Sequence, residues 1–336
     1  MQIRQVLIPE ERAAVAALLD AVGLSAPDAV GETLYAEEAG KIVATVSRTG
    51  ELVSHLAVDP AFQGEAVASD LVGALLSRMN AEGIHRRLVF TKSAYVPLFR
   101  SMHFKPVADS GVVAILENGS PDLEMELAAI RTLVERTFGL PVASLDLGAI
   151  VVNCNPMTLG HQGLIRFAAA RHQAFLVFVL EEDASTFSYE ERIAMVRLGT
   201  REITNVLVVP STKYVVSNLT FPSYFLKTMS ARDREHARLD AVIFRDRFMP
   251  SLHIVRRYIG TEFDPMMQTY NGLLKETLGE KLFELDRFEM GGAPISASRV
   301  RKLLYEGKTE EALELVPQSN RGLLRAIWEE RHGQPR

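Results

Sequence analysis

Residues 148–168 read GAIVVNCNPMTLGHQGLIRFA, and this stretch decides the fold of the second half of the chain. Residues 149–152 form an unbroken apolar run rich in β-branched side chains, which predicts a buried strand. Residues 153–156 predict a tight turn, and apolar positions at helical spacing from residue 164 onward predict a helix that begins near Gly160. A parallel strand delivers such a turn to the open edge of an α/β sheet, so we expect a ligand site there.

The start of this helix is suited to an anion, because first-turn N–H groups lack intrahelical partners and the helix dipole is positive there. Thr158 and His161 lie three residues apart across Gly160, so both side chains can face one phosphate while the glycine lets the backbone approach it. His161 can donate through a ring nitrogen, and a protonated ring adds charge where charge develops at phosphorus. The alternative is an ordinary strand–turn–helix unit with a histidine at the helix start.

Two segments resemble the paired phosphate-binding elements of the nucleotidylyltransferase superfamily. TLGH at 158–161 resembles its HxGH signature, with threonine in place of the first histidine, and ISASRVR at 295–301 resembles its ISxSxxR element. Ser296 and Ser298 can cap N–H groups and donate hydroxyls to phosphate, and Arg301 can reach phosphate with its planar guanidinium. The second segment alone would be a helix cap with surface arginines, but both segments in this order favour a nucleotide site.

Length and composition exclude several classes of protein. The chain has 336 residues, which suggests two domains, and its net charge of −5 does not favour nucleic acid as a partner. A single cysteine, Cys154, excludes an internal disulfide and a cysteine zinc site, and fits a reducing compartment. The start shows no pattern of a signal peptide, and no apolar run reaches 18 residues. We therefore expect a cytoplasmic protein without a membrane partner.

Residues 1–119 predict a small α/β domain. Its predicted elements are a helix at 11–19, a hairpin of 41–46 with 51–58, a helix at 69–79, a strand at 87–91, a helix at 94–102 and one extended stretch at 104–116. This order, with a loop of the pattern Gln-x-x-small-x-small before the second helix, resembles the GNAT acetyltransferase fold. The loop of that family holds the pyrophosphate of acetyl-CoA.

The GNAT resemblance implies a weak site for a CoA-like arm at Gln63, Gly64, Ala66 and Ala68. Ala66 stands where the family has its first glycine, so we expect a domain that keeps the fold without acetyltransferase activity. An alternative is that the domain acetylates a protein. His55 and Glu51 could act as bases for such a reaction, although a lone histidine in a strand is more often structural.

The rest of the chain predicts a connecting helix within residues 120–147 and a second domain at 148–336. Strands and helices alternate in this domain, which predicts a parallel, doubly wound, Rossmann-like sheet. The expected strands are at 149–153, 174–180, 206–209, 254–258 and 281–285, and the expected helices are at 160–171, 189–199, 234–247, 266–278 and from 296 to 305.

Further segments resemble the citrate lyase ligase family, and the resemblance covers essentially the whole chain. The segments that carry it are NCNP at 153–156, EED at 181–183 with Phe187 and Arg192, TFPSYFLK at 220–227, LD at 239–240 before Ile243-Phe244, and TYN at 269–271. Met157 stands where an aromatic residue is expected. The order of a GNAT-like domain and a nucleotidylyltransferase-like domain also matches the family.

This resemblance implies an AMP-forming ligase. ATP, with Mg²⁺, would activate acetate with release of pyrophosphate. The acetyl group would then pass to the prosthetic-group thiol of the acyl-carrier subunit of citrate lyase. The family implies catalytic roles for Thr158, His161 and Arg301, and the whole nucleotide site would comprise Asn155, Pro156, Thr158, Gly160, His161, Ser296, Ser298 and Arg301. No protein metal cage is apparent in the sequence.

Two other functions remain open: an adenylyltransferase that makes a dinucleotide from a phosphorylated cofactor precursor, and a non-catalytic sensor of ATP and acetyl-CoA. The GNAT-like domain is also a candidate dock for the CoA-like arm of the carrier. We interpret Cys154 as a buried turn residue. Arg192 and Lys227 are candidates for phosphate or acetate contacts, and Asp240 is a candidate for Mg²⁺ binding or a structural role.

Overall fold

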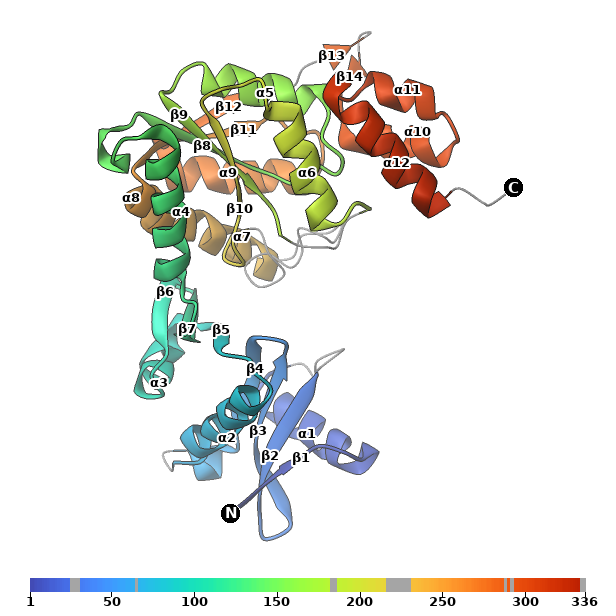
Figure 1. Ribbon diagram of the computed structural model, residues 1–336. Coiled ribbons are helices and arrows are strands. Elements are labelled where there is room, and N and C mark those ends of the chain that lie inside the picture. The colour runs from blue at the N-terminus through green and yellow to red at the C-terminus, as the bar shows by residue number, and fades with distance from the viewer. Residues whose placement is uncertain are drawn as a thin grey trace. The chain divides into compact units, whose positions relative to one another are not determined.

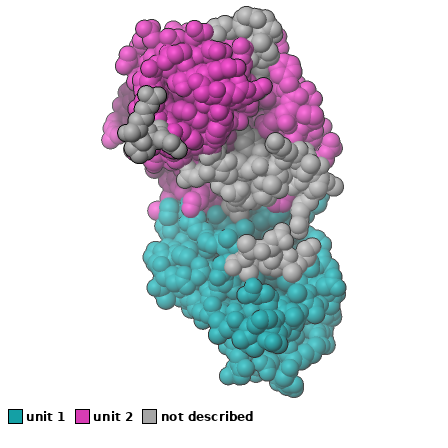
Figure 2. Space-filling model, turned by 90° about the vertical axis from the view of Figure 1, so that its right-hand side faces the viewer, with its two compact units in different colours: residues 1–123 teal, residues 124–336 magenta. Residues whose placement is uncertain are grey.

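The computed structural model describes residues 1–24, 31–63, 66–181, 186–215, 231–286, 289–290 and 293–332. The chain divides into two compact units, residues 1–123 and 124–336 (Figures 1 and 2). None of the helices within the described ranges has the length and apolar character needed to cross a membrane.

Unit 1 is an α/β fold around one mixed sheet of seven described strands, in the order β1-β2-β3-β4-β5-β7-β6 (Figure 1). Its elements are β1 Gln2–Gln5, α1 Pro9–Ala21, β2 Glu32–Glu38, β3 Lys41–Thr49, β4 Leu52–Val58, α2 Val67–Ala81, β5 Arg86–Lys92, α3 Val96–Ser101, β6 Lys105–Asp109 and β7 Val113–Gly119. The predicted hairpin of β3 and β4 and the predicted helix α2 are confirmed. β1 and β2 were not predicted.

Strands β4 and β5 form the parallel pair of this sheet, and they pair over a short distance. Leu52 is in register with Leu88 and Val53 with Val89, so the pairing lies at the beginning of both strands. Within β4, His55 has a positive φ of 51° beside a shift in register with β3. Such a bulge bends a strand away from regular pairing, which fits strands that separate toward their carboxyl ends.

The prediction of one extended stretch at 104–116 was wrong, because the chain turns back within it. β6 and β7 are antiparallel neighbours. The Asp109 carboxylate accepts a hydrogen bond from the Gly111 N–H at 2.8 Å, and Gly111 has a φ of 87°. An aspartate that bonds to the backbone two residues on, followed by a glycine with positive φ, is a local turn that apolar patterning alone does not reveal.

Unit 2 contains a sheet of five described strands in the order β10-β9-β8-β11-β12. All neighbouring strands are parallel, which confirms the doubly wound, Rossmann-like fold. The elements up to this sheet's last strand are α4 Leu123–Phe138, β8 Leu147–Val152, α5 Leu159–Ala169, β9 Ala174–Val179, α6 Tyr189–Thr200, β10 Val206–Pro210, α7 Ala231–Ile243, α8 Met249–Leu252, β11 Ile254–Gly260, α9 Pro265–Leu278 and β12 Leu282–Leu285.

The end of the chain adds a short hairpin and a group of helices (Figure 1). These elements are β13 Glu289–Met290, β14 Ala293–Pro294, α10 Ala297–Tyr305, α11 Thr309–Glu314 and α12 Arg321–His332, of which α11 and α12 were not predicted. Short 3₁₀ helices occupy Pro60–Phe62, Ser93–Tyr95, Val142–Ser144, Gly279–Lys281 and Gln318–Asn320, and a π-helical turn occupies Phe244–Phe248.

The strand order of unit 2 reverses between β8 and β11. The chain proceeds from β8 to β9 and β10 on one side and then returns to place β11 and β12 on the other. Adjacent residues of β11 show what covers each face, because successive side chains point to opposite sides of a strand. Tyr258 contacts His172, just after α5, whereas Arg257 contacts Tyr270 on α9. In open α/β sheets, ligands bind at the carboxyl ends of the strands where the order reverses.

Candidate functional site

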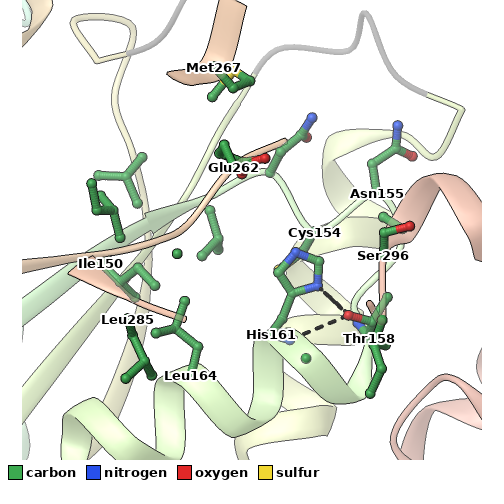
Figure 3. A pocket seen from close by; sticks show the side chains of 18 of the residues that line it. Ile150, Cys154, Asn155, Thr158, His161, Leu164, Glu262, Met267, Leu285 and Ser296 are labelled. Carbon is green, nitrogen blue, oxygen red and sulfur yellow. Dashed lines mark hydrogen bonds between the residues drawn. The ribbon is translucent and has the colours of Figure 1, made fainter. Parts of the chain in front are cut away.

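A pocket of about 320 Å³ opens at this reversal, at the carboxyl ends of β8 and β11 (Figure 3). The loop after β8, the first turn of α5 and the first turn of α10 supply one part of its wall. These three segments contribute all of the predicted nucleotide-site residues except Pro156, namely Asn155, Thr158, Gly160, His161, Ser296, Ser298 and Arg301. Segments more than 130 residues apart in the chain therefore meet at one place.

The loop after β8 is held by a buried arginine. Arg192 on α6 is fully buried, and its Nη1 donates to the carbonyl oxygens of Asn153 and Leu180 at 3.1 and 2.8 Å. Its Nε donates to the Phe187 carbonyl at 3.1 Å, and the Phe187 N–H donates to the Asn155 side chain, also at 3.1 Å. Arg192 is absent from the pocket wall. Its described donors face backbone carbonyls and the Asn153 side chain, so they fix this loop, and the suggested contact with phosphate or acetate stays a prediction.

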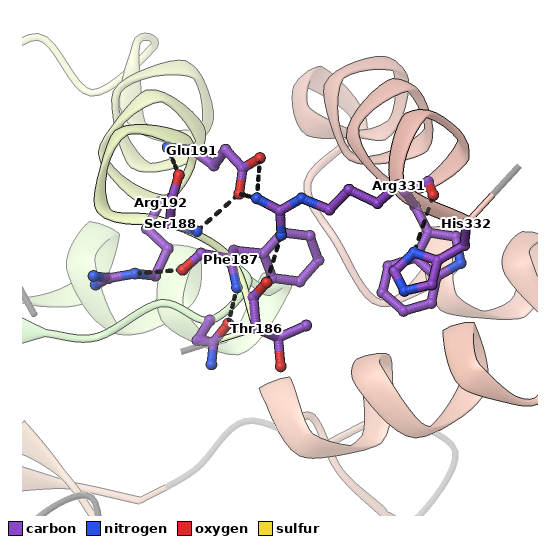
Figure 4. Close-up of polar contacts among 9 residues, drawn as sticks. Thr186, Phe187, Ser188, Glu191, Arg192, Arg331 and His332 are labelled. Atoms are coloured by element: carbon purple, nitrogen blue, oxygen red, sulfur yellow. Dashed lines mark hydrogen bonds and ion pairs between the residues drawn. The ribbon is translucent and has the colours of Figure 1, made fainter. Parts of the chain in front are cut away.

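The start of α6 is tied in turn to the C-terminal helix α12 (Figure 4). Arg331 donates through Nη2 to both carboxylate oxygens of Glu191 at 2.6 Å, and through Nη1 to the Thr186 carbonyl at 2.6 Å. The Glu191 carboxylate also accepts the Ser188 N–H at 2.8 Å in a capping box. Residues 186–188, which directly precede α6, are thus held by both Arg192 and Arg331.

Thr158 and His161 bond to each other at the start of α5. Thr158 is the N-cap residue and is fully buried, and its hydroxyl lies 2.9 Å from His161 Nδ1 and 3.3 Å from the His161 N–H. The Thr158 N–H donates to the same Nδ1 at 3.1 Å. A backbone N–H can only donate, so Nδ1 is the acceptor and the ring proton lies on Nε2. The capping contacts thereby select the tautomer that donates from Nε2.

The first turn of α10 provides the opposite side. Ser296 is its N-cap residue, and the Ser296 hydroxyl accepts the Arg299 N–H at 3.1 Å. Arg301 donates from Nη2 to the Ser298 hydroxyl at 3.2 Å and from Nη1 to the Asn155 carbonyl, which links α10 to the loop after β8. Burial lowers the pKa of the Arg301 guanidinium, although an arginine stays charged at neutral pH.

The two helix starts approach each other closely at Gly160. A methyl group at this position would lie 3.1 Å from the Ile295 carbonyl oxygen, just before α10. Among the described residues, the N–H groups of Gly160, Ala297 and Ser298 have no protein acceptor, and all three residues line the pocket. Two positive helix ends with open N–H groups favour an anion between them. The arrangement can therefore bind the phosphates of a nucleotide.

The side of the His161 ring that faces away from Thr158 is apolar. Figure 3 shows Ile150, Leu164 and Leu285 on one side of the His161 ring, and Thr158 on the other. Glu262, Met267 and Asp286 also line the pocket, and the sequence did not single them out.

The pocket also reaches a buried polar network that the sequence did not predict. Arg257 on β11 donates from Nη2 to the Tyr270 hydroxyl at 3.3 Å, and that hydroxyl donates to the Asp240 carboxylate at 2.6 Å. Arg257 and Tyr270 line the pocket, whereas Asp240 lies behind them, fully buried. Burial, more than the neighbouring Asp240 charge, raises the pKa of Tyr270 far above its ordinary value. The two adjacent arginines Arg256 and Arg257 within a parallel strand were the signal in the sequence, because such strands are normally hydrophobic.

Three other residues that the sequence singled out have a structural role or lie outside the described residues. Cys154 lines the pocket but is almost fully buried, and burial raises the pKa of its thiol, which suits a turn residue better than a nucleophile. Met157 is buried against Gly199. A side chain at position 199 would collide with the Met157 sulfur, so this methionine requires a glycine opposite it. Lys227 and the whole run at 220–227 lie outside the described residues.

The predicted CoA-loop residues belong to unit 1. Gln63 Nε2 donates to the Val58 carbonyl at 3.4 Å, and Ala66 is the N-cap residue of α2. Gly64 lies outside the described residues, and Ala68 is half-buried in the first turn of α2. Glu51, suggested as a base, accepts a hydrogen bond from the Arg86 side chain at 3.0 Å.

Comparisons with known proteins match both units. The profile of the citrate lyase ligase C-terminal domain matches residues 147–323, and that of the GNAT acetyltransferase domain matches residues 28–129. The citrate (pro-3S)-lyase ligase of Klebsiella pneumoniae is 33% identical over 307 residues, which cover 89% of this chain and 88% of that protein. The proteins of the same name from Escherichia coli K12 and Haemophilus influenzae are each 31% identical over 82% of this chain, and the match covers 80% and 84% of their own lengths.

Proposed function

Because the chain belongs to the citrate lyase ligase family, we propose that it activates citrate lyase by an ATP-dependent acetylation. Acetate and ATP first form acetyl-AMP and pyrophosphate. The acetyl group then passes to the prosthetic-group thiol on the acyl-carrier subunit of the lyase. The observation that carries this proposal is the convergence of two helix starts, with His161 and Arg301, on one pocket at the strand reversal.

In this proposal the triphosphate lies between α5 and α10. The open N–H groups of Gly160, Ala297 and Ser298 bind phosphate oxygens, and the guanidinium of Arg301 balances the charge of the β- and γ-phosphates. Ser296 contributes by capping α10 and so keeps its first turn in place. Asn155 and Pro156 shape the loop after β8 that faces this site.

His161 acts at the α-phosphate. A carboxylate oxygen of acetate attacks the α-phosphorus, and the bond from that phosphorus to the bridging oxygen breaks. Pyrophosphate leaves with the electron pair. Negative charge grows on the α-phosphate oxygens as this happens, and the His161 Nε2–H donates to one of them. The ring donates without giving up its proton, so the step balances with acetyl-AMP and pyrophosphate as products.

Thr158 acts through His161 in this proposal. Its hydroxyl and N–H both lie against His161 Nδ1, so Thr158 orients the ring and keeps the proton on Nε2. Thr158 is thus a positioning residue, whereas His161 is the catalytic residue that contacts the nucleotide. The histidine that the superfamily has at this position would fill the same place with a different hydrogen-bonding group.

Mg²⁺ enters this proposal with the nucleotide. Glu262 and Asp286 line the pocket, and their carboxylates fit an ion that usually takes one or two protein carboxylates together with phosphate oxygens and water. In the described ranges, no group of three or more His, Cys, Asp or Glu side chains could hold a metal by itself. When bound, the ion would supply positive charge to the phosphates.

In the second half-reaction the carrier thiol attacks the acetyl carbonyl of acetyl-AMP. A thioester bond forms, the bond between the acyl carbon and the AMP oxygen breaks, and AMP leaves while the thiol proton passes to solvent.

The N-terminal unit offers a separate surface for the CoA-like arm of the carrier. Ala66 has no side-chain acceptor to cap α2, which leaves the first-turn N–H groups of α2 for a pyrophosphate.

The test is release of pyrophosphate from ATP with acetate, measured with and without the thiol form of the citrate lyase carrier. Citrate cleavage by that lyase is followed afterwards. Acetate-dependent release that restores cleavage is the expected result. Release that instead requires a phosphorylated cofactor precursor, with a dinucleotide as the product, would overturn the proposal in favour of an adenylyltransferase.

A further inference from the structure

Arg257 is a buried charge that is only partly satisfied. It is 1% exposed, yet among the residues that the structure describes its Nε and Nη1 have no hydrogen-bond partner. Its contacts are the Nη2 bond to Tyr270 and the ring of Phe244, whose centroid lies 4.3 Å from the guanidinium carbon. Burying charged N–H groups without acceptors is costly, so such a side chain normally marks a place where an acceptor binds.

The open donors of Arg257 belong to the same pocket as His161. Arg257 lines the pocket together with Ile259 and Met267. It extends from the face of the sheet covered by α9, whereas His161 is on α5, which packs on the other face. The pocket thus has two cationic or polar ends, one formed by the helix starts and one formed by Arg257. An arginine fork suits a carboxylate or a phosphate.

The surroundings of Arg257 favour a small monoanion over a polyphosphate. Asp240 lies behind Tyr270 and is bonded to the same hydroxyl, so one negative charge already balances much of the Arg257 charge. A further single charge can be accommodated beside this pair, whereas several phosphate charges would also face the Asp240 carboxylate. Nearby apolar side chains, Ile259 and Met267, suit the hydrocarbon part of a short-chain acid.

We propose that Arg257 binds the carboxylate of the acid that is activated. This inference rests on the proposed function and names the acid subsite within that site. One carboxylate oxygen accepts from Arg257, and the other stays free to attack the α-phosphorus of the nucleotide bound beside it. Tyr270 and Asp240 hold the guanidinium in place and do not contact the acid.

The main experiment measures binding without chemistry. Equilibrium dialysis of ¹⁴C-acetate in the presence of α,β-methylene-ATP compares the full-length protein with Arg257→Met and Arg257→Lys, and with Arg256→Met as the matched control. Arg256 is the exposed neighbour on the same strand. We expect Arg257→Met to weaken acetate binding by about 10- to 100-fold, as loss of a charged hydrogen bond does, with unchanged affinity for the nucleotide analogue. The lysine variant should retain part of the affinity, and Arg256→Met should retain all of it.

Unchanged acetate binding in folded Arg257→Met, or equal weakening by Arg256→Met, would overturn the inference. The two proposals fail separately: a wild-type protein that binds acetate through Arg257 but forms no acetyl-AMP contradicts the function alone. If neither Arg257 variant folds, competition binding to the wild-type protein tests the inference instead. Propionate should then displace acetate while the neutral isostere acetamide does not, and displacement by acetamide at similar concentrations would contradict a site built on a guanidinium.

Discussion

Replacing Thr158 by valine keeps the shape of this buried side chain and removes its hydroxyl. Two contacts are lost, at 2.9 Å to His161 Nδ1 and at 3.3 Å to the His161 N–H, while the backbone contact at 3.1 Å remains. Loss of a helix N-cap costs about 1 kcal/mol in the free energy of unfolding. Since one of the two donors to Nδ1 persists, we expect about 10-fold slower adenylation, equivalent to ~1.4 kcal/mol.

The assay is acetate-dependent exchange of labelled pyrophosphate into ATP at saturating substrates. Thr158→Ser serves as the control, because serine keeps the hydroxyl and should stay within about 2-fold of the wild-type rate. His161→Ala removes the donor to the α-phosphate and should cost on the order of 10²- to 10³-fold. The informative protein is the double variant, which shows whether the two residues act as one unit.

A positioning role requires that Thr158→Val have almost no further effect on the exchange rate when His161 is already alanine. The hydroxyl would then have nothing left to orient. A further 10-fold loss in the double variant would refute the reasoning, because Thr158 would then contact the nucleotide independently of His161. The loss in unfolding free energy should persist in both backgrounds, which separates folding from catalysis.

Three more predictions concern other parts of the chain. Gly160→Ala should raise the KM for ATP several-fold and fail to stabilise the protein, because the added methyl group meets the Ile295 carbonyl oxygen at 3.1 Å. Gly272→Ala is the control, because Gly272 lies in a helix with open space around it. This control variant should raise the free energy of unfolding, measured by chemical denaturation, by up to ~1 kcal/mol. Burial raises the pKa of the Cys154 thiol above its ordinary value near 9. Above pH 9 the folded state therefore keeps a proton that the unfolded state loses, so the free energy of unfolding decreases as the pH rises. Between pH 8 and pH 10 the wild type should lose about 1 kcal/mol more than Cys154→Ala, and equal losses in denaturant titrations would contradict this. Ala66→Glu places a negative charge at the start of α2, so it should raise the KM for the carrier while sparing acetyl-AMP formation, and equal damage to both steps would rule out a docking role.

The main strands and helices of the second unit could be predicted because each is long and strongly patterned. β8 and β9 are buried on both faces and carry continuous apolar runs, which is the expected pattern for a parallel sheet. β1 has the sequence Gln-Ile-Arg-Gln and lies mostly exposed at the edge of its sheet, so no pattern distinguishes it from a loop. The turn between β6 and β7 is held by local hydrogen bonds of Asp109 and Ser110, which the pattern of apolar residues does not reveal.

The site could be predicted where its chemistry is local in sequence. Thr158, His161, Ser296 and Arg301 lie within helix starts that short motifs describe, and the structure brings them to one pocket. What short motifs cannot describe is which partner each side chain takes. The hydroxyl of Thr158, for example, lies 2.9 Å from His161 Nδ1, a contact that the motif does not specify. Arg257 depends on contacts with α7 and α9, which only tertiary structure supplies.

The link between Arg301 and the Asn155 carbonyl joins residues 146 positions apart. Every strand of the five-stranded sheet after β8 lies between these two residues in the chain, so the sheet can form before the phosphate-binding site is complete. Long-range contacts of this kind form late, because the loop between them must be closed first. A nascent chain that has emerged only as far as β12 has all five strands of this sheet but lacks Ser296, Ser298 and Arg301. The proposed nucleotide site is therefore completed after the strands that carry it.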